Sequence, residues 1–293
     1  MTWYEAIILG IVEGITEFLP ISSTGHLIIA ADLMGMSDDE ETKAAIDGYI
    51  IVIQAFALLA IIGLYLPRMI QMLRGLLGRD RNGLKLFINI CIAFAPILVL
   101  GPLLHSTIMT HLFRPTPVLL ALFLGGIWMI WIDHRRKQLG EEQFSLEIDD
   151  LTWKHALGIG LFQCASMWPG TSRAMMTIAG ATVLGMKPAR AAEFSFLLGL
   201  PTILGATVYE VGQDLLRNRD PESADPETAV MFDVIGWGPL LLGCLVTVIS
   251  AALAVKWLVS FLSHHGLAAF GWYRIGLCIV IGVLLLFNVI QLA

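Results

Sequence analysis

The stretch that decides the fold is Glu13-Gly14-Ile15-Thr16-Glu17-Phe18-Leu19-Pro20-Ile21-Ser22-Ser23-Thr24-Gly25-His26. It places two carboxylates, a cluster of hydroxyls and an imidazole inside a run that is otherwise apolar from Ala6 to Ala31. A charged side chain at membrane depth costs at least about 2.5 kcal/mol on insertion scales, so such residues usually face a cavity or a partner. The stretch therefore predicts a functional site inside a membrane-embedded segment.

The same stretch predicts a broken helix. Glu13 and Glu17 are four residues apart, so they lie on one face of a helix that Pro20 then interrupts. The residues that follow the proline are types that favour a new helix N-terminus: Ser22, Ser23 and Thr24. A helix broken at membrane depth is tolerated where its freed backbone groups meet protein or water. We therefore expect residues 3–36 to form a re-entrant helix-loop-helix hairpin.

The composition indicates a polytopic membrane protein. Hydrophobic residues make up 57% of the 293 residues and charged residues 14%, with a mean hydropathy of +0.77. Ordinary soluble domains carry roughly 25% charged residues. The net charge of -6 argues against nucleic acid as a partner, and the four cysteines are scattered without the spacing of a metal or redox site.

Six apolar runs are long enough to be spanning helices: 49–66, 86–104, 118–132, 189–210, 237–260 and 270–291. Basic residues cluster in the connectors 68–85 and 134–154, which the positive-inside rule places in the cytoplasm. The acidic stretches 37–48 and 217–233 and both termini are then expected outside.

A second broken segment repeats the first. Pro169-Gly170-Thr171-Ser172-Arg173 lies between two short apolar helices within 155–186, and three spans follow each hairpin. Since three is odd, the second unit is inverted relative to the first. We predict an all-α polytopic membrane protein with an inverted-topology repeat, six spanning helices and two re-entrant hairpins. It forms one domain, 1–293, with repeats at about 1–133 and 153–293.

Inverted repeats with broken helices place a site near the bilayer midplane, where half-helix N-termini bind anions. Arg173 adds a planar fork suited to phosphate oxygens, and hydroxyl donors come from Ser23, Ser172 and Thr177. Glu13 and Glu17 would repel a phosphate unless a divalent cation bridged them. Histidine side chains can carry a proton near neutral pH, so His26 is a candidate proton carrier. Together these groups indicate metal-assisted phosphoryl chemistry.

Three motifs resemble one known family, the undecaprenyl-diphosphatases, also called bacitracin-resistance proteins. They are residues 13–26, Pro169-Gly-Thr-Ser-Arg173 and Glu193-Phe-Ser-Phe-Leu-Leu198, and the order of apolar segments agrees along the chain. The chain departs from the family pattern at Ala174-Met175, where serine-glycine is usual, and after Gln54, where a glycine is usual.

The resemblance implies hydrolysis of undecaprenyl diphosphate to undecaprenyl phosphate and inorganic phosphate. This reaction recycles the lipid carrier for peptidoglycan synthesis and confers bacitracin resistance. The implied cofactor is Mg²⁺ or Ca²⁺, and the implied location is the bacterial inner membrane, with the site open to the extracytoplasmic side. A homodimer is a further prediction.

The site residues follow from mapping the family motifs onto this sequence. The predicted catalytic residues are Glu17, Ser23, His26 and Arg173. The predicted metal ligands are Glu13 and Glu17. The predicted substrate-binding residues are Ser22, Thr24, Gly170, Ser172, Arg173 and Thr177. Whether Ser23 attacks phosphorus or positions a water is left open.

Other interpretations compete with this one. Glu5, Glu13 and Glu17 lie on one side of a helical wheel, so they would also suit an amphipathic helix lying at the membrane interface. Ser22 and Ser23 would also serve as N-caps alone, His26 as a buried structural histidine, and Arg173 as a structural charge. A transporter or lipid flippase is the alternative function, because inverted repeats with broken helices are transporter architecture.

Overall fold

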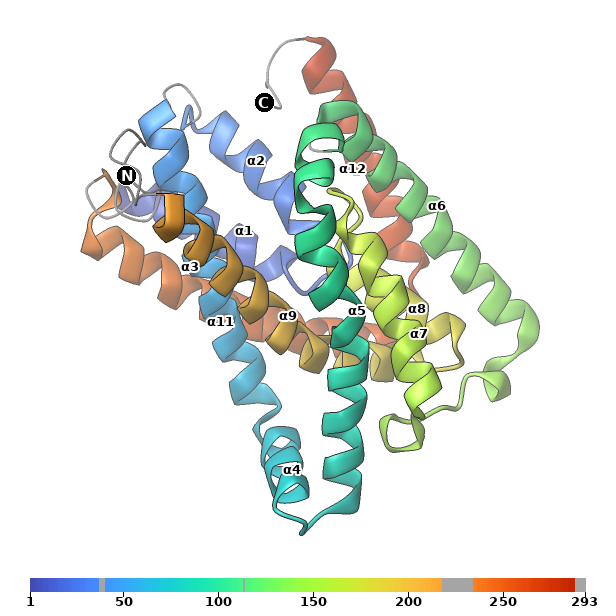
Figure 1. The fold of residues 1–293 in the computed structure, drawn as a ribbon. Coiled ribbons are helices and arrows are strands. Elements are labelled where there is room, and N and C mark those ends of the chain that lie inside the picture. The colour runs from blue at the N-terminus through green and yellow to red at the C-terminus, as the bar shows by residue number, and fades with distance from the viewer. Residues whose placement is uncertain (37–39, 113, 218–233, 288–293) are drawn as a thin grey trace.

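The computed structural model describes residues 1–36, 40–112, 114–217 and 234–287, and these ranges are helical apart from short connections (Figure 1). The acidic stretch 217–233 lies almost wholly outside the described residues. The helices in chain order are α1 (Trp3–Thr16), α2 (Ser23–Leu33), α3 (Glu40–Leu64), α4 (Leu66–Leu76), α5 (Arg81–His111), α6 (Pro115–Leu139), α7 (Trp153–Cys164), α8 (Arg173–Val183), α9 (Pro188–Arg217), α11 (Trp237–His264) and α12 (Ala268–Leu286).

The predicted all-α fold with six spans is confirmed. Among the described residues, six helices are long and apolar enough to cross a membrane: α3, α5, α6, α9, α11 and α12. Several are longer than the apolar runs that predicted them. The helix α5 covers Arg81–His111, because residues on both sides of the apolar run 86–104 continue the helix. Pro96 and Pro102 lie in its interior.

The two broken segments form short helix pairs, α1 with α2 and α7 with α8. The second helix of each pair has 11 residues. At 1.5 Å per residue, such a helix is about 16 Å long, roughly half the thickness of a bilayer's hydrocarbon core. Neither helix spans, so each pair has the dimensions of the predicted re-entrant hairpin.

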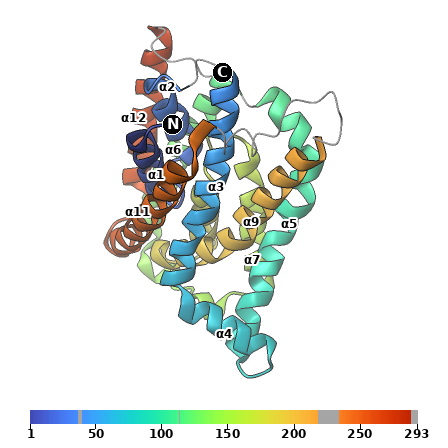
Figure 2. The same cartoon turned by 90° about the vertical axis from the view of Figure 1, so that its left-hand side faces the viewer.

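One element departs from the prediction. The segment after the first span, expected as a connector, forms α4. Pro67 lies in its first turn, where proline is well tolerated, and Leu73 and Leu76 are exposed along one side. The close approach of α4 to α5 depends on Gly75 and Gly83, since a Cβ on Gly83 would lie 1.9 Å from the Gln71 carbonyl oxygen. Figures 1 and 2 show α4 at the end of the molecule opposite the N-terminus.

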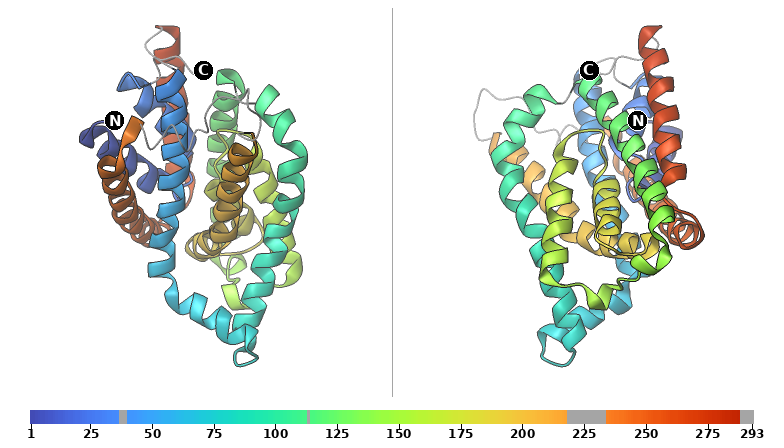
Figure 3. Two further views of the ribbon diagram at one scale, coloured as in Figure 1. Left: turned by 60° about the vertical axis from the view of Figure 1, so that its left-hand side comes forward. Right: turned by 90° about the vertical axis from the view of Figure 1, so that its right-hand side faces the viewer.

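Both basic connectors lie at the α4 end, and they contact each other there. Arg68 pairs with Asp149 at 3.4 Å, and the Lys85 ammonium donates to the Asp149 carbonyl oxygen at 2.7 Å. Two connectors separated by two spans therefore meet on one side, as the charge distribution predicts. Figure 3 shows the N-terminus and the end of α12 together at the other end.

The first hairpin is held by close backbone packing. Gly14 of α1 faces α11, where an added Cβ would lie 2.0 Å from Ser250 Oγ and 2.5 Å from the Thr247 carbonyl oxygen. Lipid tails are as apolar as side chains, so small residues that let backbones approach are a main means of joining helices in membranes. Gly10 makes the same approach to Gly243. This contact fixes where α1 presents its carboxylates.

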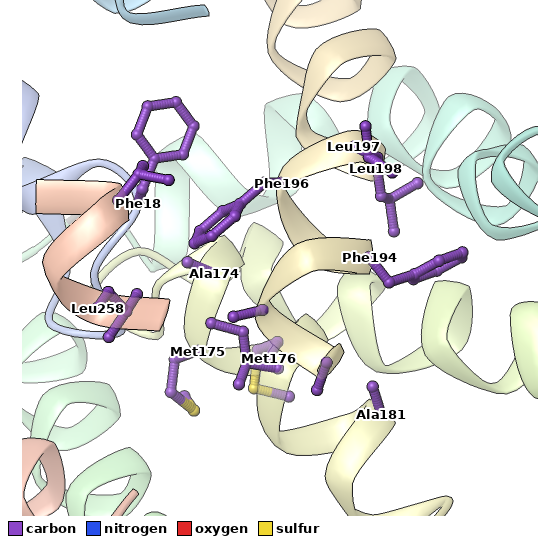
Figure 4. Packing of buried hydrophobic residues seen from close by; sticks show 14 of the residues in the cluster. Phe18, Ala174, Met175, Met176, Ala181, Phe194, Phe196, Leu197, Leu198 and Leu258 are labelled. Atoms are coloured by element: carbon purple, nitrogen blue, oxygen red, sulfur yellow. The ribbon is translucent and has the colours of Figure 1, made fainter. Parts of the chain in front are cut away.

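The second hairpin is enclosed by the core. Every residue of α8 from Ala174 to Thr182 is buried. Phe18, which follows α1, meets Phe196 of α9 edge to face at 5.7 Å between ring centroids. Figure 4 shows Phe18, Phe196 and the α8 residue Ala174 in one region of this core. The loops of the two hairpins are thereby packed against a common set of apolar side chains.

Candidate active site

A cavity of about 210 Å³ lies where the two hairpin loops meet. The loops contribute most of its polar wall, and α3, α5 and α9 complete it. Its lining residues are Glu17, Ser22, Ser23, Thr24, Gln54, Ile97, Ser166, Met167, Pro169, Gly170, Ser172, Arg173, Thr202, Ile203 and Ala206. Two motifs far apart in the sequence thus face one space.

An ion pair joins the hairpins across this cavity. Arg173 Nη2 donates to Glu17 Oε1 at 3.0 Å, with side-chain exposures of 11% and 6%. Arg173 Nη1 donates to the Ser195 carbonyl oxygen at 3.2 Å, and its guanidinium lies 5.8 Å from the centre of the Phe18 ring. The guanidinium is therefore held from several sides while still lining the cavity.

The second carboxylate oxygen of Glu17 accepts a hydrogen bond from a serine hydroxyl. Ser23 Oγ donates to Glu17 Oε2 at 2.9 Å. A carboxylate that already accepts a hydroxyl proton in a hydrogen bond is placed to accept that proton outright. The pair Glu17 and Ser23 is thus arranged to activate either the Ser23 hydroxyl or a water held beside it.

The two loops share an unusual backbone conformation. Ser22 and Ser172 each precede a half-helix and have φ angles of 74° and 72°. Non-glycine residues pay about 1–2 kcal/mol for left-handed conformations, and such strain is concentrated at functional sites. Ser172 Oγ accepts from the Met175 N–H at 3.3 Å, whereas Ser22 makes no side-chain cap. The N-termini of α2 and α8 both border the cavity, which favours an anion there.

Glu13 does not line this cavity. It is 1% exposed, and both of its carboxylate oxygens lack a hydrogen-bond partner among the described residues. Buried polar atoms are rarely left unsatisfied. A carboxylate with two open oxygens, one helical turn from Glu17, fits a ligand to a hard divalent cation.

His26 is turned away from the cavity. Its Nδ1 lies 2.7 Å from the Ser22 carbonyl oxygen, and its Nε2 lies 2.7 Å from the Tyr273 hydroxyl oxygen. The ring is also stacked on Tyr273, at 5.7 Å between centroids. In the neutral ring, Nδ1–H donates to Ser22 and Nε2 accepts from Tyr273. His26 therefore fastens the first loop to α12, and its predicted role as a proton carrier stays a prediction.

Thr177 also lies outside the cavity lining. It is fully buried, and its hydroxyl donates to the Arg173 carbonyl oxygen at 2.9 Å and contacts the Ser195 hydroxyl. It supports the helical turn that carries Arg173 and does not face the cavity. Gly170 and Ser172 do line it, and Gly170 has a φ of 92° that glycine adopts without strain.

The sequence predicts that three polar residues connect the site to the bundle by hydrogen bonds: Gln54, Gln163 and Glu193. Gln54 lines the cavity, and Gln163 Oε1 accepts from the cavity residue Thr202 at 3.3 Å. Glu193 does not follow this expectation. It pairs with Arg68 and Arg190, each at 3.0 Å, in the ion-pair network beside the basic connectors. Charged partners in that network account for the burial of Glu193. Ser195 and Phe196 of the same motif instead contact Arg173 and Phe18 beside the cavity.

Sequence reasoning missed Arg274. It lies in the apolar run of α12, is fully buried, and donates to the Gly170 and Thr171 carbonyl oxygens of the second loop. An arginine within an apolar segment needs a partner, and this argument applies to Arg274 as it does to Arg173. The cavity residues Ser166 and Thr202 gave no comparable signal.

Comparison with known proteins identifies the family. Residues 6–280 match the family model described as bacitracin resistance protein BacA. The chain belongs to this family. A relative from Pseudomonas aeruginosa, named undecaprenyl-diphosphatase, is 42% identical over 282 residues, which cover 96% of this chain and 92% of the relative.

Further relatives carry the same name. The undecaprenyl-diphosphatase of Sorangium cellulosum is 40% identical over 277 residues, covering 94% of this chain and 84% of the relative. That of Nitrosomonas eutropha is 39% identical over 277 residues, covering 94% and 92%. The resemblance drawn from the motifs is thereby confirmed over nearly the whole chain. These comparisons give no support to the transporter alternative.

Proposed function

We propose that this protein hydrolyses undecaprenyl diphosphate to undecaprenyl phosphate and inorganic phosphate, the activity for which its relatives are named. One observation carries the proposal. Glu17 holds Arg173 with one oxygen and the Ser23 hydroxyl with the other, so the carboxylate joins an anion-binding group and a hydroxyl in a single cavity.

The diphosphate would bind to the positively charged side chain and the helix N-termini that face the cavity. Arg173 and the N-termini of α2 and α8 face the cavity, with hydroxyls from Ser22, Thr24 and Ser172 beside them. Backbone N–H groups at a helix N-terminus and a guanidinium fork both suit phosphate oxygens. The apolar part of the cavity wall comes from α5 and α9, through Ile97, Ile203 and Ala206. A prenyl chain could pack against this wall.

The chemical step uses Glu17 and Ser23. In one course, Glu17 accepts a proton from a water, whose oxygen bonds the terminal phosphorus while the bond to the bridging oxygen breaks. In the other, the Ser23 oxygen forms that bond first, and water then cleaves the phosphoserine. Either course releases inorganic phosphate and leaves the bridging oxygen on undecaprenyl phosphate. Arg173 stabilises the charge that develops on the transferred phosphoryl oxygens.

Mg²⁺ or Ca²⁺ is part of the proposal. The open carboxylate oxygens of Glu13 and the nearby carboxylate of Glu17 are the groups that would hold it. A divalent cation held by these carboxylates would offset the negative charge of the substrate. Glu13, Glu17 and Ser23 are hard oxygen donors, which suits either ion.

We place the protein in the bacterial inner membrane with its site open to the extracytoplasmic side. The positive-inside rule supports this orientation, since the basic connectors gather at the α4 end. Ile97 and Thr202 lie near the middle of α5 and α9, so the cavity is at membrane depth.

A homodimer is a prediction that light scattering in detergent would test.

The test is phosphate release from a prenyl diphosphate by purified protein in detergent. We expect release with Mg²⁺, loss of release with EDTA, and recovery when Mg²⁺ or Ca²⁺ is added in excess. The matched control is Glu17→Gln, which keeps the size of the side chain and removes its charge. Folded wild-type protein that releases no phosphate with either ion would refute the proposal.

A further inference from the structure

Arg274 is the most deeply buried charge outside the cavity. It is fully buried in α12, and no carboxylate pairs with it in the described part of the chain. Four hydrogen bonds to carbonyl oxygens satisfy it instead: Nε to Leu122 at 3.2 Å, Nη1 to Thr171 at 3.0 Å, and Nη2 to Ala121 at 3.1 Å and Gly170 at 2.8 Å. Moving this guanidinium away from its hydrogen-bond partners would cost folding free energy, because it would leave a buried charge unpaired.

Glycines on α6 and α12 make room for this reach. A Cβ on Gly125 would lie 2.6 Å from Arg274 Nη2, and a Cβ on Gly126 would lie 2.8 Å from the Gly271 carbonyl oxygen. The two helices therefore approach closely enough for the guanidinium to extend past α6 to the loop before α8. Gly125 leaves the space that the guanidinium occupies, and Gly126 lets the two backbones approach. The guanidinium therefore reaches carbonyl oxygens of both α6 and the second loop.

The loop that Arg274 holds is the one that presents Ser172 and Arg173. The Thr171–Ser172 peptide is trans, so its carbonyl and its N–H point in opposite directions. Turning the Thr171 carbonyl oxygen to Arg274 directs the Ser172 N–H to the other side of the loop, where Ser172 and Arg173 line the cavity.

We propose that Arg274 is a positioning residue for phosphoryl transfer, which orients the second loop so that its N–H groups and Arg173 meet the diphosphate. The proposal rests on the hydrolase function proposed above. Arg274 touches neither the cavity nor a reacting atom, so its effect reaches the substrate through the 170–172 backbone. A misplacement of about 1 Å at such a site can lower turnover about a hundredfold.

The test measures kcat and KM for phosphate release by Arg274→Lys, expressed per folded protein from gel filtration and thermal unfolding. Lysine keeps the charge and loses the fork that reaches several carbonyls. We expect kcat to fall roughly tenfold to a hundredfold. The control is Trp272→Phe, a 64% exposed neighbour on the same helix, which should keep wild-type kcat.

A second variant covers the case in which Arg274→Lys does not fold. Gly125→Ala keeps every hydrogen-bonding group and displaces the guanidinium by steric contact, and it should lower kcat in the same way. Unchanged kcat in either folded variant, with only the unfolding temperature lowered, would make Arg274 purely structural and overturn the proposal. Inactive wild-type protein in the same assay would instead refute the hydrolase function itself.

Discussion

Arg173 Nη2 lies 3.0 Å from Glu17 Oε1, although 156 positions separate the two residues in the chain. Glu17 belongs to the first hairpin and Arg173 to the second. The second helix of each hairpin is too short to span a bilayer, and each hairpin supplies one of the two charged groups that line the cavity. The site is therefore complete only when both loops meet.

The two glutamates should differ when they are changed. Glu17 contacts both Arg173 and Ser23, whereas Glu13 lies one turn away with its oxygens open. Glu17→Gln should therefore abolish phosphate release more completely than Glu13→Gln. Glu13→Gln should instead raise the Mg²⁺ concentration needed for half-maximal activity. Steady-state phosphate release over a Mg²⁺ titration measures both effects. A folded Glu17→Gln protein with wild-type turnover would remove the proposed mechanism.

Arg173 should be needed for its shape as well as its charge. Lysine keeps the charge but cannot form the bidentate contacts of the guanidinium. If the contact strengthens as charge develops in the transition state, it is worth about 2.7–4 kcal/mol, so Arg173→Lys should lower turnover by roughly two to three orders of magnitude. Arg173→Ala should do at least as much damage. Wild-type turnover in folded Arg173→Lys would make the arginine a structural charge.

The sequence predicted most of what depends on local signals. Prolines, helix-capping residue types and apolar runs indicated both broken hairpins and all six spans, and charges inside apolar runs indicated Glu17 and Arg173. Side-chain direction was not predictable. His26 follows the hydroxyl cluster in sequence, yet its ring turns to Tyr273, which is 247 positions away. Such contacts depend on how α12 packs, and no local pattern encodes that.

The helix α4 and the residue Glu193 were missed for related reasons. The segment that forms α4 is short and rich in arginine, so its charges suggested a connector, while its helix depends on packing against α5 through Gly75 and Gly83. Glu193 was predicted to connect the site to the bundle by hydrogen bonds. Its partners, Arg68 and Arg190, become visible only when α4 and α9 are brought together.

Backbone strain at Ser22 should be measurable. Its φ of 74° suits glycine, and its side chain makes no capping bond. Ser22→Gly should therefore stabilise the folded protein by about 1 kcal/mol, the left-handed penalty less the entropy of glycine. Ser22→Ala keeps the strain and is the matched control. The readout is the thermal unfolding midpoint in one detergent, and a Ser22→Gly protein no more stable than Ser22→Ala would contradict the argument.

The topology makes a separate prediction. In a variant whose four native cysteines are replaced, a single cysteine at position 39 or 225 should react with an impermeant thiol reagent in intact cells. Both positions lie outside the described residues. A cysteine at position 81, at the start of α5 beside α4, should react only after the membrane is permeabilised. Labelling of position 81 in intact cells would contradict the inverted arrangement.

The most direct test of the central claim is phosphorus NMR of undecaprenyl diphosphate incubated with purified protein and Mg²⁺ in water enriched in ¹⁸O. The account predicts that the diphosphate signals are replaced by equal amounts of lipid monophosphate and inorganic phosphate, with ¹⁸O in the inorganic phosphate alone. The same sample with Arg173→Ala should change little over that time. Persistence of the diphosphate in the presence of folded wild-type protein, or ¹⁸O in the lipid phosphate, would contradict it.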